Sequence, residues 1–124
     1  MQRTKSKSKK INLGFIGAGF IAQECHIPSF DKVSNCKLNS IADLHYDLAK
    51  KIGSKYSFNN IYEKHSDLLK NNDIDAVIVT LPRNLTAGVV EECLLAGKHV
   101  LTEKPLAFNY ETGKRLKDLS EKNK

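Results

Sequence analysis

Two short motifs in this chain combine residue types that could do chemistry. The first, Gly17-Ala18-Gly19-Phe20-Ile21-Ala22, directly follows the mostly apolar run 11–16, and the second, Glu103-Lys104-Pro105, follows a later apolar run. A glycine-rich turn between a strand and a helix presents backbone N–H groups and the positive end of a helix dipole to a phosphate. A lysine ammonium can stabilise the negative charge that develops on a reacting oxygen. The motifs therefore indicate an anion-binding turn and a candidate catalytic group, Lys104.

The glycine motif has the spacing of a dinucleotide-binding fingerprint. Gly17 permits a tight turn, Gly19 lets the backbone approach a pyrophosphate, and Ala22 is small enough for the helix to pack on the strand. We therefore predict that this motif binds a nicotinamide dinucleotide through Gly17, Gly19, Phe20, Ile21 and Ala22.

Asp43 is placed to bind the ribose of such a cofactor. It ends a second, largely apolar run, 38–42, and lies 24 residues after Gly19. A carboxylate at the tip of the second strand accepts hydrogen bonds from the adenosine ribose hydroxyls. Its negative charge would repel a 2′-phosphate, so NAD is favoured over NADP. The alternative is that Asp43 only caps the helix that follows it.

The charge of the chain is concentrated at its start. The net charge is +6, but five of the 20 Lys and Arg residues lie in residues 1–10, leaving 15 against 14 acidic residues. We expect residues 1–10 to be a disordered tail and residues 11–124 to form one dinucleotide-binding domain. The tail has no aromatic residue for base stacking and no apolar stretch, so we expect neither a nucleic-acid nor a membrane partner.

The three cysteines, Cys25, Cys36 and Cys93, have neither metal-ligand nor disulfide-framework spacing. We expect free thiols in a reducing compartment and no metal site. The N-terminal cations are not followed by an apolar core of signal-peptide length, and no run approaches the length of a membrane span. These observations predict a cytoplasmic protein.

Strands and helices alternate along the whole sequence. This order predicts a Rossmann-type α/β fold, a doubly wound parallel sheet in the strand order 3-2-1-4-5 with helices on both faces. The predicted strands are 11–17, 37–43, 56–58, 75–80 and 99–102. The predicted helices run from about 20 to 28, over 44–52 ending at Gly53, over 66–70, over 85–94 ending at Gly97, and from a cap at Asn109 onward. Apolar residues recur at helical spacing in these helices, including Leu44 in the second and Leu85 on the apolar face of the fourth.

In these residues the chain resembles the glucose-fructose oxidoreductase and inositol dehydrogenase family, often called Gfo/Idh/MocA. The resemblance covers about residues 11–121 and is most specific in the stretch 96–106. Its other pieces are the glycine motif, His26-Ile27-Pro28, Ala42-Asp43, Asp73-Ile74-Asp75-Ala76-Val77 and Leu81-Pro82. It implies an NAD(P)-dependent oxidoreductase that moves hydride between nicotinamide and a sugar, cyclitol or related polyol.

The resemblance also implies roles for single residues. Lys104 would lie beside the nicotinamide and the reacting hydroxyl, Glu103 would be structural or close to the nicotinamide ribose, and Leu81, Pro82 and Asn84 would line the cofactor. Many relatives have a histidine where this chain has Thr86, a residue that could instead cap its helix. The family's C-terminal α/β domain, which supplies most substrate contacts, is not in the sequence.

Three interpretations follow. The chain is the cofactor-binding domain of such an enzyme and inactive alone, a stand-alone NAD-binding sensor or partner module, or a remnant without cofactor affinity. The intact fingerprint argues against the remnant. We expect a homo-oligomer, because the missing domain would leave apolar surface and a strand edge open. His26 is a lesser candidate for cofactor or substrate contact, and Lys98 is expected on a solvated face.

Overall fold

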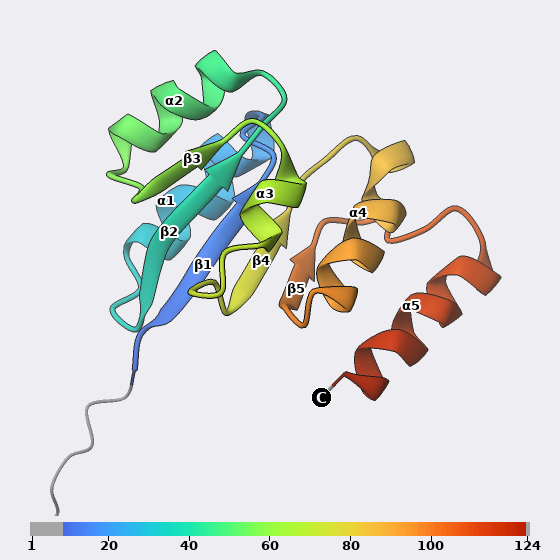
Figure 1. Cartoon of the computed structure of the whole chain (residues 1–124). Helices are drawn as coiled ribbons and strands as arrows, with labels where there is room; N and C mark the ends of the chain where they lie inside the picture. The colour runs from blue at the N-terminus through green and yellow to red at the C-terminus, as the bar shows by residue number, and fades with distance from the viewer. Residues whose placement is uncertain (1–8, 124) are drawn as a thin grey trace, which may run out of the picture.

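A five-stranded parallel sheet organises the chain (Figure 1). The computed structural model describes residues 9–123, so most of the predicted basic tail lies outside the described residues. The strands run in the order β3-β2-β1-β4-β5, and every neighbouring pair is parallel, which confirms the predicted topology. Their bounds are β1 Ile11–Ile16, β2 Cys36–Ala42, β3 Asn60–Tyr62, β4 Ala76–Val79 and β5 His99–Thr102.

Helices cover both faces of this sheet (Figure 1). One face carries a π-helical turn, α1 and α2, and the other carries α3, α4 and α5. Parallel strands need such crossover helices, which bury both faces of the sheet. Their bounds are η1 Ala22–His26 (the π-helical turn), α1 Ile27–Asp31, α2 Tyr46–Lys55, α3 His65–Leu69, α4 Arg83–Leu95 and α5 Tyr110–Lys122.

The sheet separates two hydrophobic cores. Side chains of a strand alternate between its faces, so Phe15 of β1 packs toward α1 and α2 while Ile16 packs toward α3 and α4. Phe15 is fully buried and meets the rings of Phe30 and Phe58 edge-to-face, with centroids 6.1 and 5.7 Å apart. The inner strand β1 is thereby held on both faces, which gives the loop at its carboxyl end a rigid base.

The helix after the glycine motif begins at Phe20 as predicted, but it continues past Pro28 to Asp31. Five of its residues form the π-helical turn, in which the N–H of Ile27 bonds to the carbonyl of Ala22. Such a turn holds one extra residue, which places both Ala22 and Ile27 against the core. Pro28 lies at the first turn of the following α-helix, where its missing N–H is tolerated.

The end of α2 and the position of β3 differ from the prediction. Gly53 does not end the helix: it lies inside it, buried where a Cβ would come within 2.7 Å of Ile61. The helix ends instead at Lys55, and Ser57, two residues further on, has a φ of +58°. The N–H of Phe58 bonds to the carbonyl of Gly53 and that of Ser57 to Ser54, which is a Schellman motif. Residues 56–58 are therefore this turn, and the third strand follows at Asn60–Tyr62.

Two side chains have environments opposite to those predicted. Leu44 was expected on the buried face of α2 but precedes that helix and is 71% exposed. Lys98 was expected in solvent but is buried, and its ammonium donates hydrogen bonds to the carbonyls of Asn71 and Ile74 at 3.0 and 2.9 Å. Because these carbonyls belong to the loop before β4, Lys98 ties this loop to the start of β5.

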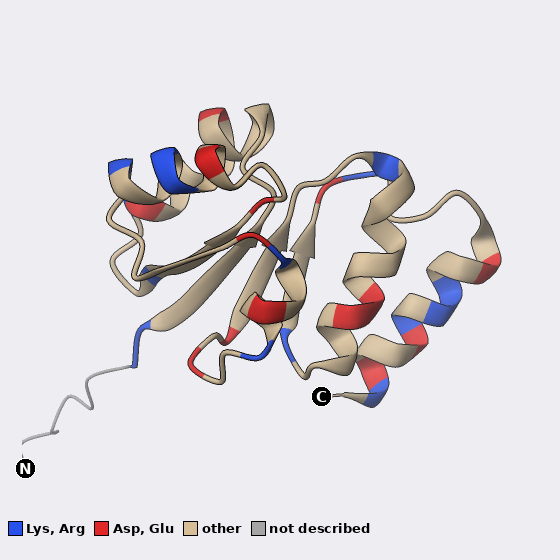
Figure 2. Cartoon of the chain, turned by 45° about the horizontal axis from the view of Figure 1, so that its top comes forward, with Lys and Arg blue, Asp and Glu red and all other residues tan. Residues whose placement is uncertain are grey.

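The predicted C-terminal end of α4 and the predicted N-cap of α5 are both confirmed. Gly97, with φ +78°, follows α4 in a second Schellman motif, and Asn109 accepts a hydrogen bond from the N–H of Thr112 at the start of α5. Figure 2 shows charges of both signs along the outer surface of α5. Arg115 joins α5 to α4 through Glu91 at 2.7 Å.

Within residues 9–123, no helix combines the length and the hydropathy that a membrane crossing needs.

Candidate functional site

The glycine turn lies at the point where the order of the sheet reverses. β1 is flanked by β2 on one side and by β4 on the other. The helix that follows β2 lies on one face of the sheet, and the helix that follows β4 lies on the opposite face. Ligands of open α/β sheets bind in the crevice at the carboxyl ends of such strands. The loops after β1, β2 and β4 are therefore where a binding site is expected.

Gly17 is required by the geometry of this turn. Its φ is +102°, and a Cβ at this position would lie 2.2 Å from the carbonyl oxygen of Thr80. The backbone of the turn is held on both sides: the N–H of Gly17 bonds to Ala42, and the hydroxyl of Thr80 donates to the carbonyl of Gly17 at 3.2 Å. Only glycine combines this conformation with this close approach.

Gly19 and Ala22 meet the other two requirements of a dinucleotide cradle. A Cβ built on Gly19 would contact no protein atom within 4 Å, so the backbone there faces open space at the start of the helix. Ala22 is fully buried and brings the helix close to the sheet. The turn thus leaves room for a pyrophosphate next to free helix N–H groups. The residues present fit a bound dinucleotide.

Asp43 is fixed beside the glycine turn by two backbone groups. The N–H of Ala18 donates to Oδ2 at 2.8 Å and the N–H of His45 donates to Oδ1 at 2.8 Å. The second hydrogen bond closes a local turn between Asp43 and His45. The N-cap of α2 is His45, so Asp43 does not cap this helix. A carboxylate has about four acceptor positions. Both oxygens therefore retain capacity for hydroxyl donors.

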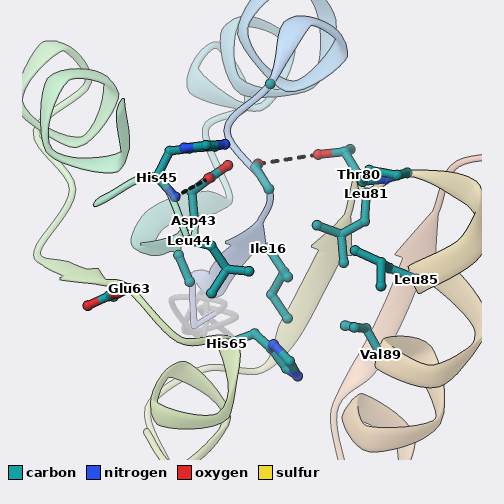
Figure 3. A pocket seen from close by; sticks show the side chains of 14 residues that line it. Ile16, Asp43, Leu44, His45, Glu63, His65, Thr80, Leu81, Leu85 and Val89 are labelled. Atoms are coloured by element: carbon teal, nitrogen blue, oxygen red, sulfur yellow. Dashed lines mark hydrogen bonds between the residues drawn. The ribbon is translucent and has the colours of Figure 1, made fainter. Parts of the chain in front are cut away.

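A cavity of about 370 Å³ opens between the loops after β2 and β4. Figure 3 shows its two sides, with Leu44 beside Asp43 on one and Leu85 beside Leu81 on the other, and Ile16 between them. The cavity is mostly apolar, with polar groups at its rim, which is the common character of small-molecule sites. It is lined by Ile16, Gly17, Gly19, Ala42, Asp43, Leu44, His45, Glu63, His65, Thr80, Leu81, Pro82, Leu85 and Val89.

The structure brings five of the predicted binding residues into this cavity, namely Gly17, Gly19, Asp43, Leu81 and Pro82. The remaining ones lie elsewhere: Phe20 and Ile21 are exposed on the first helical turn, Ala22 is in the core, and Asn84 is exposed on α4. Glu103 and Lys104 follow β5, outside the cavity lining.

Sequence reasoning missed several residues of the cavity. Leu44 and Leu85 were assigned to the apolar faces of helices, but both side chains are exposed. Leu44 precedes α2, and Leu85 lies in the first turn of α4. His45, Glu63 and His65 had no motif around them. Their common signal is position, since each follows the carboxyl end of β2 or β3. His65 is paired with Glu92 of α4 at the edge of the cavity.

Lys104 lies in an exposed loop at the same edge of the sheet, and the Lys104–Pro105 peptide bond is cis. Among residues 9–123 no carboxylate forms an ion pair with its ammonium. Its neighbour Glu103 is paired instead with His26, at 2.6 Å between Oε1 and Nε2. The loop that carries the candidate catalytic lysine is thus joined to the helix that follows the glycine turn.

Thr86 is buried in the first turns of α4 and does not cap this helix, whose N-cap is Pro82. Its hydroxyl bonds back to the carbonyls of Leu81 and Pro82 at 3.4 and 3.3 Å. The expectation of a capping threonine was therefore wrong, because the hydroxyl satisfies the carbonyls that precede the helix.

No three His, Cys, Asp or Glu side chains of residues 9–123 are grouped as metal ligands would be. The buried thiol of Cys93 has its pKa raised to about 12, first by burial and then by the charge of Glu92. Such a thiol is not a nucleophile at neutral pH.

Comparison with known proteins agrees with this geometry. Residues 11–124 match the Gfo/Idh/MocA family, described as an oxidoreductase family with an NAD-binding Rossmann fold. This chain belongs to that family.

Among curated relatives, a dTDP-3,4-didehydro-2,6-dideoxy-alpha-D-glucose 3-reductase of Actinomadura kijaniata is 33% identical over 90% of this chain and 33% of its own length. An inositol 2-dehydrogenase/D-chiro-inositol 3-dehydrogenase of Shouchella clausii is 35% identical over 78% of this chain and 28% of its own length. The chain thus spans about a third of the length of these relatives.

A solved structure shares the fold closely. A 3-ketoreductase from Actinomadura kijaniata, in complex with TDP-benzene and NADP, superposes with a TM-score of 0.88 and 32% identity. The match covers 93% of this chain and 36% of that one. The described part of this chain therefore corresponds to the NAD-binding Rossmann domain of Gfo/Idh/MocA oxidoreductases.

Proposed function

We propose that this chain binds NAD at the glycine turn and serves as the cofactor domain of an oxidoreductase acting on a sugar, cyclitol or related polyol. The observation that carries the proposal is the joint geometry of Gly17 and Asp43. Gly17 permits the tight turn that leaves open backbone where a pyrophosphate would bind. The N–H of Ala18 holds Asp43 Oδ2 at 2.8 Å, beside the position that the ribose would take. When bound, the cofactor supplies a hydride acceptor or donor at its nicotinamide ring.

The preference for NAD rests on charge. Both oxygens of Asp43 are held by neutral backbone donors, and within residues 9–123 no Lys, Arg or His forms an ion pair with this carboxylate. None of the 14 lining residues, all within the described part of the chain, is Lys or Arg. A 2′-phosphate at this position would meet a carboxylate without a counter-charge, which costs binding free energy. A related ketoreductase was solved with NADP, and titration of this chain with both cofactors measures the preference directly.

The proposed role of Lys104 is to bind and polarise the substrate hydroxyl. Its exposed ammonium follows the last strand, and no carboxylate of residues 9–123 neutralises it. It would stabilise an alkoxide as the hydroxyl proton leaves. The substrate class is supported by two relatives, a reductase named for a dTDP-linked dideoxysugar and a dehydrogenase named for inositols.

Titration calorimetry with NAD and NADP tests the proposal. Gly19→Val fills only the open space at the turn, so it should leave the thermal unfolding temperature nearly unchanged while abolishing binding of both cofactors. Gly113→Val, on the distant helix α5 and also without a neighbour within 4 Å, is the matched control and should bind as the parent does. Equal binding by Gly19→Val and the parent would contradict the assignment.

A further inference from the structure

One ion pair joins two segments of the site that are 77 residues apart in sequence. His26 closes the π-helical turn after the glycine motif, and Glu103 precedes Lys104 after β5. Nε2 of His26 and Oε1 of Glu103 are 2.6 Å apart, with side-chain exposures of 19% and 40%. Because a carboxylate only accepts hydrogen bonds, the imidazole N–H is the donor. The imidazole side of this contact is partly buried, and the carboxylate side is more exposed.

The π-helical turn explains why His26 lies on this side of its helix. The extra residue keeps both Ala22 and Ile27 in the core, at a spacing of five that an α-helix would place about 140° apart. His26, just before Ile27, is thereby presented at the edge of the core. An uninterrupted α-helix would turn either Ile27 or His26 away from its present neighbours. π-Helical turns are often found at functional sites.

The pair determines where the charge of Glu103 lies. Glu103 and Lys104 are adjacent in an exposed loop, and a free glutamate there could neutralise the lysine ammonium. In the structure the carboxylate is held by His26, and within residues 9–123 Lys104 is left without an ion-pair partner. The loop backbone is also anchored, since the N–H of Glu103 bonds to Val79 of β4 at 3.3 Å.

We propose that His26 is a positioning residue: by holding Glu103 it fixes the loop of Lys104 against the glycine-turn helix and keeps the lysine charge available at the nicotinamide end of the site. This inference rests on the proposed function. We expect the pair to affect only one half of the cofactor site, because the adenosine end is formed by other residues, namely Asp43 and the cavity side chains. Loss of the pair should weaken binding of the nicotinamide half and spare the adenosine half.

The test compares two ligands on the 124-residue chain. His26→Gln should lower NADH affinity roughly five- to tenfold, as expected for the loss of one ordinary hydrogen bond, and change ADP affinity less than twofold. It should also alter the fluorescence of bound NADH, which reports the surroundings of the nicotinamide. Glu103→Gln keeps an acceptor for His26 and should retain most of the NADH affinity.

Arg115→Gln is the matched control. It removes another ion pair of similar length, Arg115–Glu91 at 2.7 Å, between α5 and α4. It should change neither affinity, although it removes a contact between two elements. Thermal unfolding of all three variants confirms that each is folded at the temperature of the titrations.

The outcomes separate this inference from the proposed function. If the parent chain binds neither ADP nor NADH, the proposed function fails. If the parent binds both and His26→Gln loses ADP and NADH affinity equally, or loses neither, the positioning role is wrong. A selective loss of NADH affinity with an altered fluorescence of bound NADH supports it.

Discussion

At the scale of single residues, the proposed preference for NAD rests on the geometry of Asp43. Its oxygens are oriented by the N–H groups of Ala18 and His45, so the side chain is fixed before any ligand arrives. A pre-oriented acceptor loses little conformational entropy on binding. The two backbone donors are neutral and leave the negative charge intact.

Asp43→Asn should test this selection, because it keeps the shape of the side chain and removes its charge. We expect NAD affinity to fall about tenfold, from weaker hydrogen bonds to the ribose hydroxyls, and NADP affinity to fall less or to rise. Calorimetry with both cofactors gives the ratio directly. A parent chain that binds NADP more tightly than NAD would contradict the role given to Asp43.

The cysteines give a second residue-scale prediction. Cys25 is exposed, whereas Cys93 is buried with a pKa raised to about 12. At pH 8 an alkylating reagent should modify Cys25 within minutes and reach Cys93 only when the chain unfolds, because the thiolate is the reactive form. Mass spectrometry of the native and guanidinium-denatured chain measures both sites. Rapid alkylation of native Cys93 would show that its burial is wrong.

The raised pKa of Cys93 also makes the stability of the folded chain depend on pH. The unfolded thiol of Cys93 ionises near its ordinary value of 9.0, and the folded one only near 12. The folded state thus holds this proton more tightly. The stability linked to Cys93 is complete below pH 9 and declines as the pH rises from 9 toward 12.

At the scale of elements, α2 and α4 end in the same way with different residues. Each has a Schellman motif, with Ser57 at φ +58° after α2 and Gly97 at φ +78° after α4. A non-glycine residue in this left-handed conformation carries a steric cost that glycine does not. The serine is therefore a strained helix end.

Exchanging these residues should shift stability in opposite directions. Ser57→Gly should raise the free energy of unfolding by about 0.5 to 1 kcal/mol, and Gly97→Ser should lower it by about the same amount. Urea unfolding followed by circular dichroism measures both. A destabilised Ser57→Gly variant would show that the serine side chain contributes something the backbone geometry does not reveal.

The elements also show what the sequence could reveal. The strand order, β5 and the caps at Gly97 and Asn109 were predictable because buried β-branched runs and capping residues are local signals. The position of β3 was not, because Tyr56 and Phe58 mimic a strand while Ser57 adopts a turn conformation rare for its type. Gly53 was misread because close packing against Ile61, a contact between elements, requires the glycine.

The candidate site was predictable where its residues form a local pattern, and not where residues distant in sequence meet. The glycine turn and Asp43 are recognisable by spacing, and the structure places both in one cavity. The pairing of His26 with Glu103 joins residues 77 positions apart, and no local pattern relates them. It depends on the π-helical turn and on the neighbouring positions of β1, β4 and β5, which only the fold supplies.

At the scale of the whole molecule, β5 is an edge strand of the sheet. Leu101 on this strand and Phe108 and Tyr110 after it are exposed, at 48%, 68% and 76%. Open strand edges beside apolar side chains promote association. We expect the 124-residue chain to form dimers or larger species, and Leu101→Lys to shift the population toward monomer in sedimentation velocity. A parent chain that sediments as monomer at high concentration would contradict this.

The central claim is that the loops after β1 and β2 form a dinucleotide site. Hydrogen–deuterium exchange of the parent chain with and without NADH tests it most directly. We expect slower exchange of backbone amides in the glycine turn, including Gly19, and in the loop that follows Asp43. The outer helix α5 should exchange at an unchanged rate. Protection confined to α5 or to the opposite edge of the sheet, or unchanged exchange throughout at saturating NADH, would contradict the account.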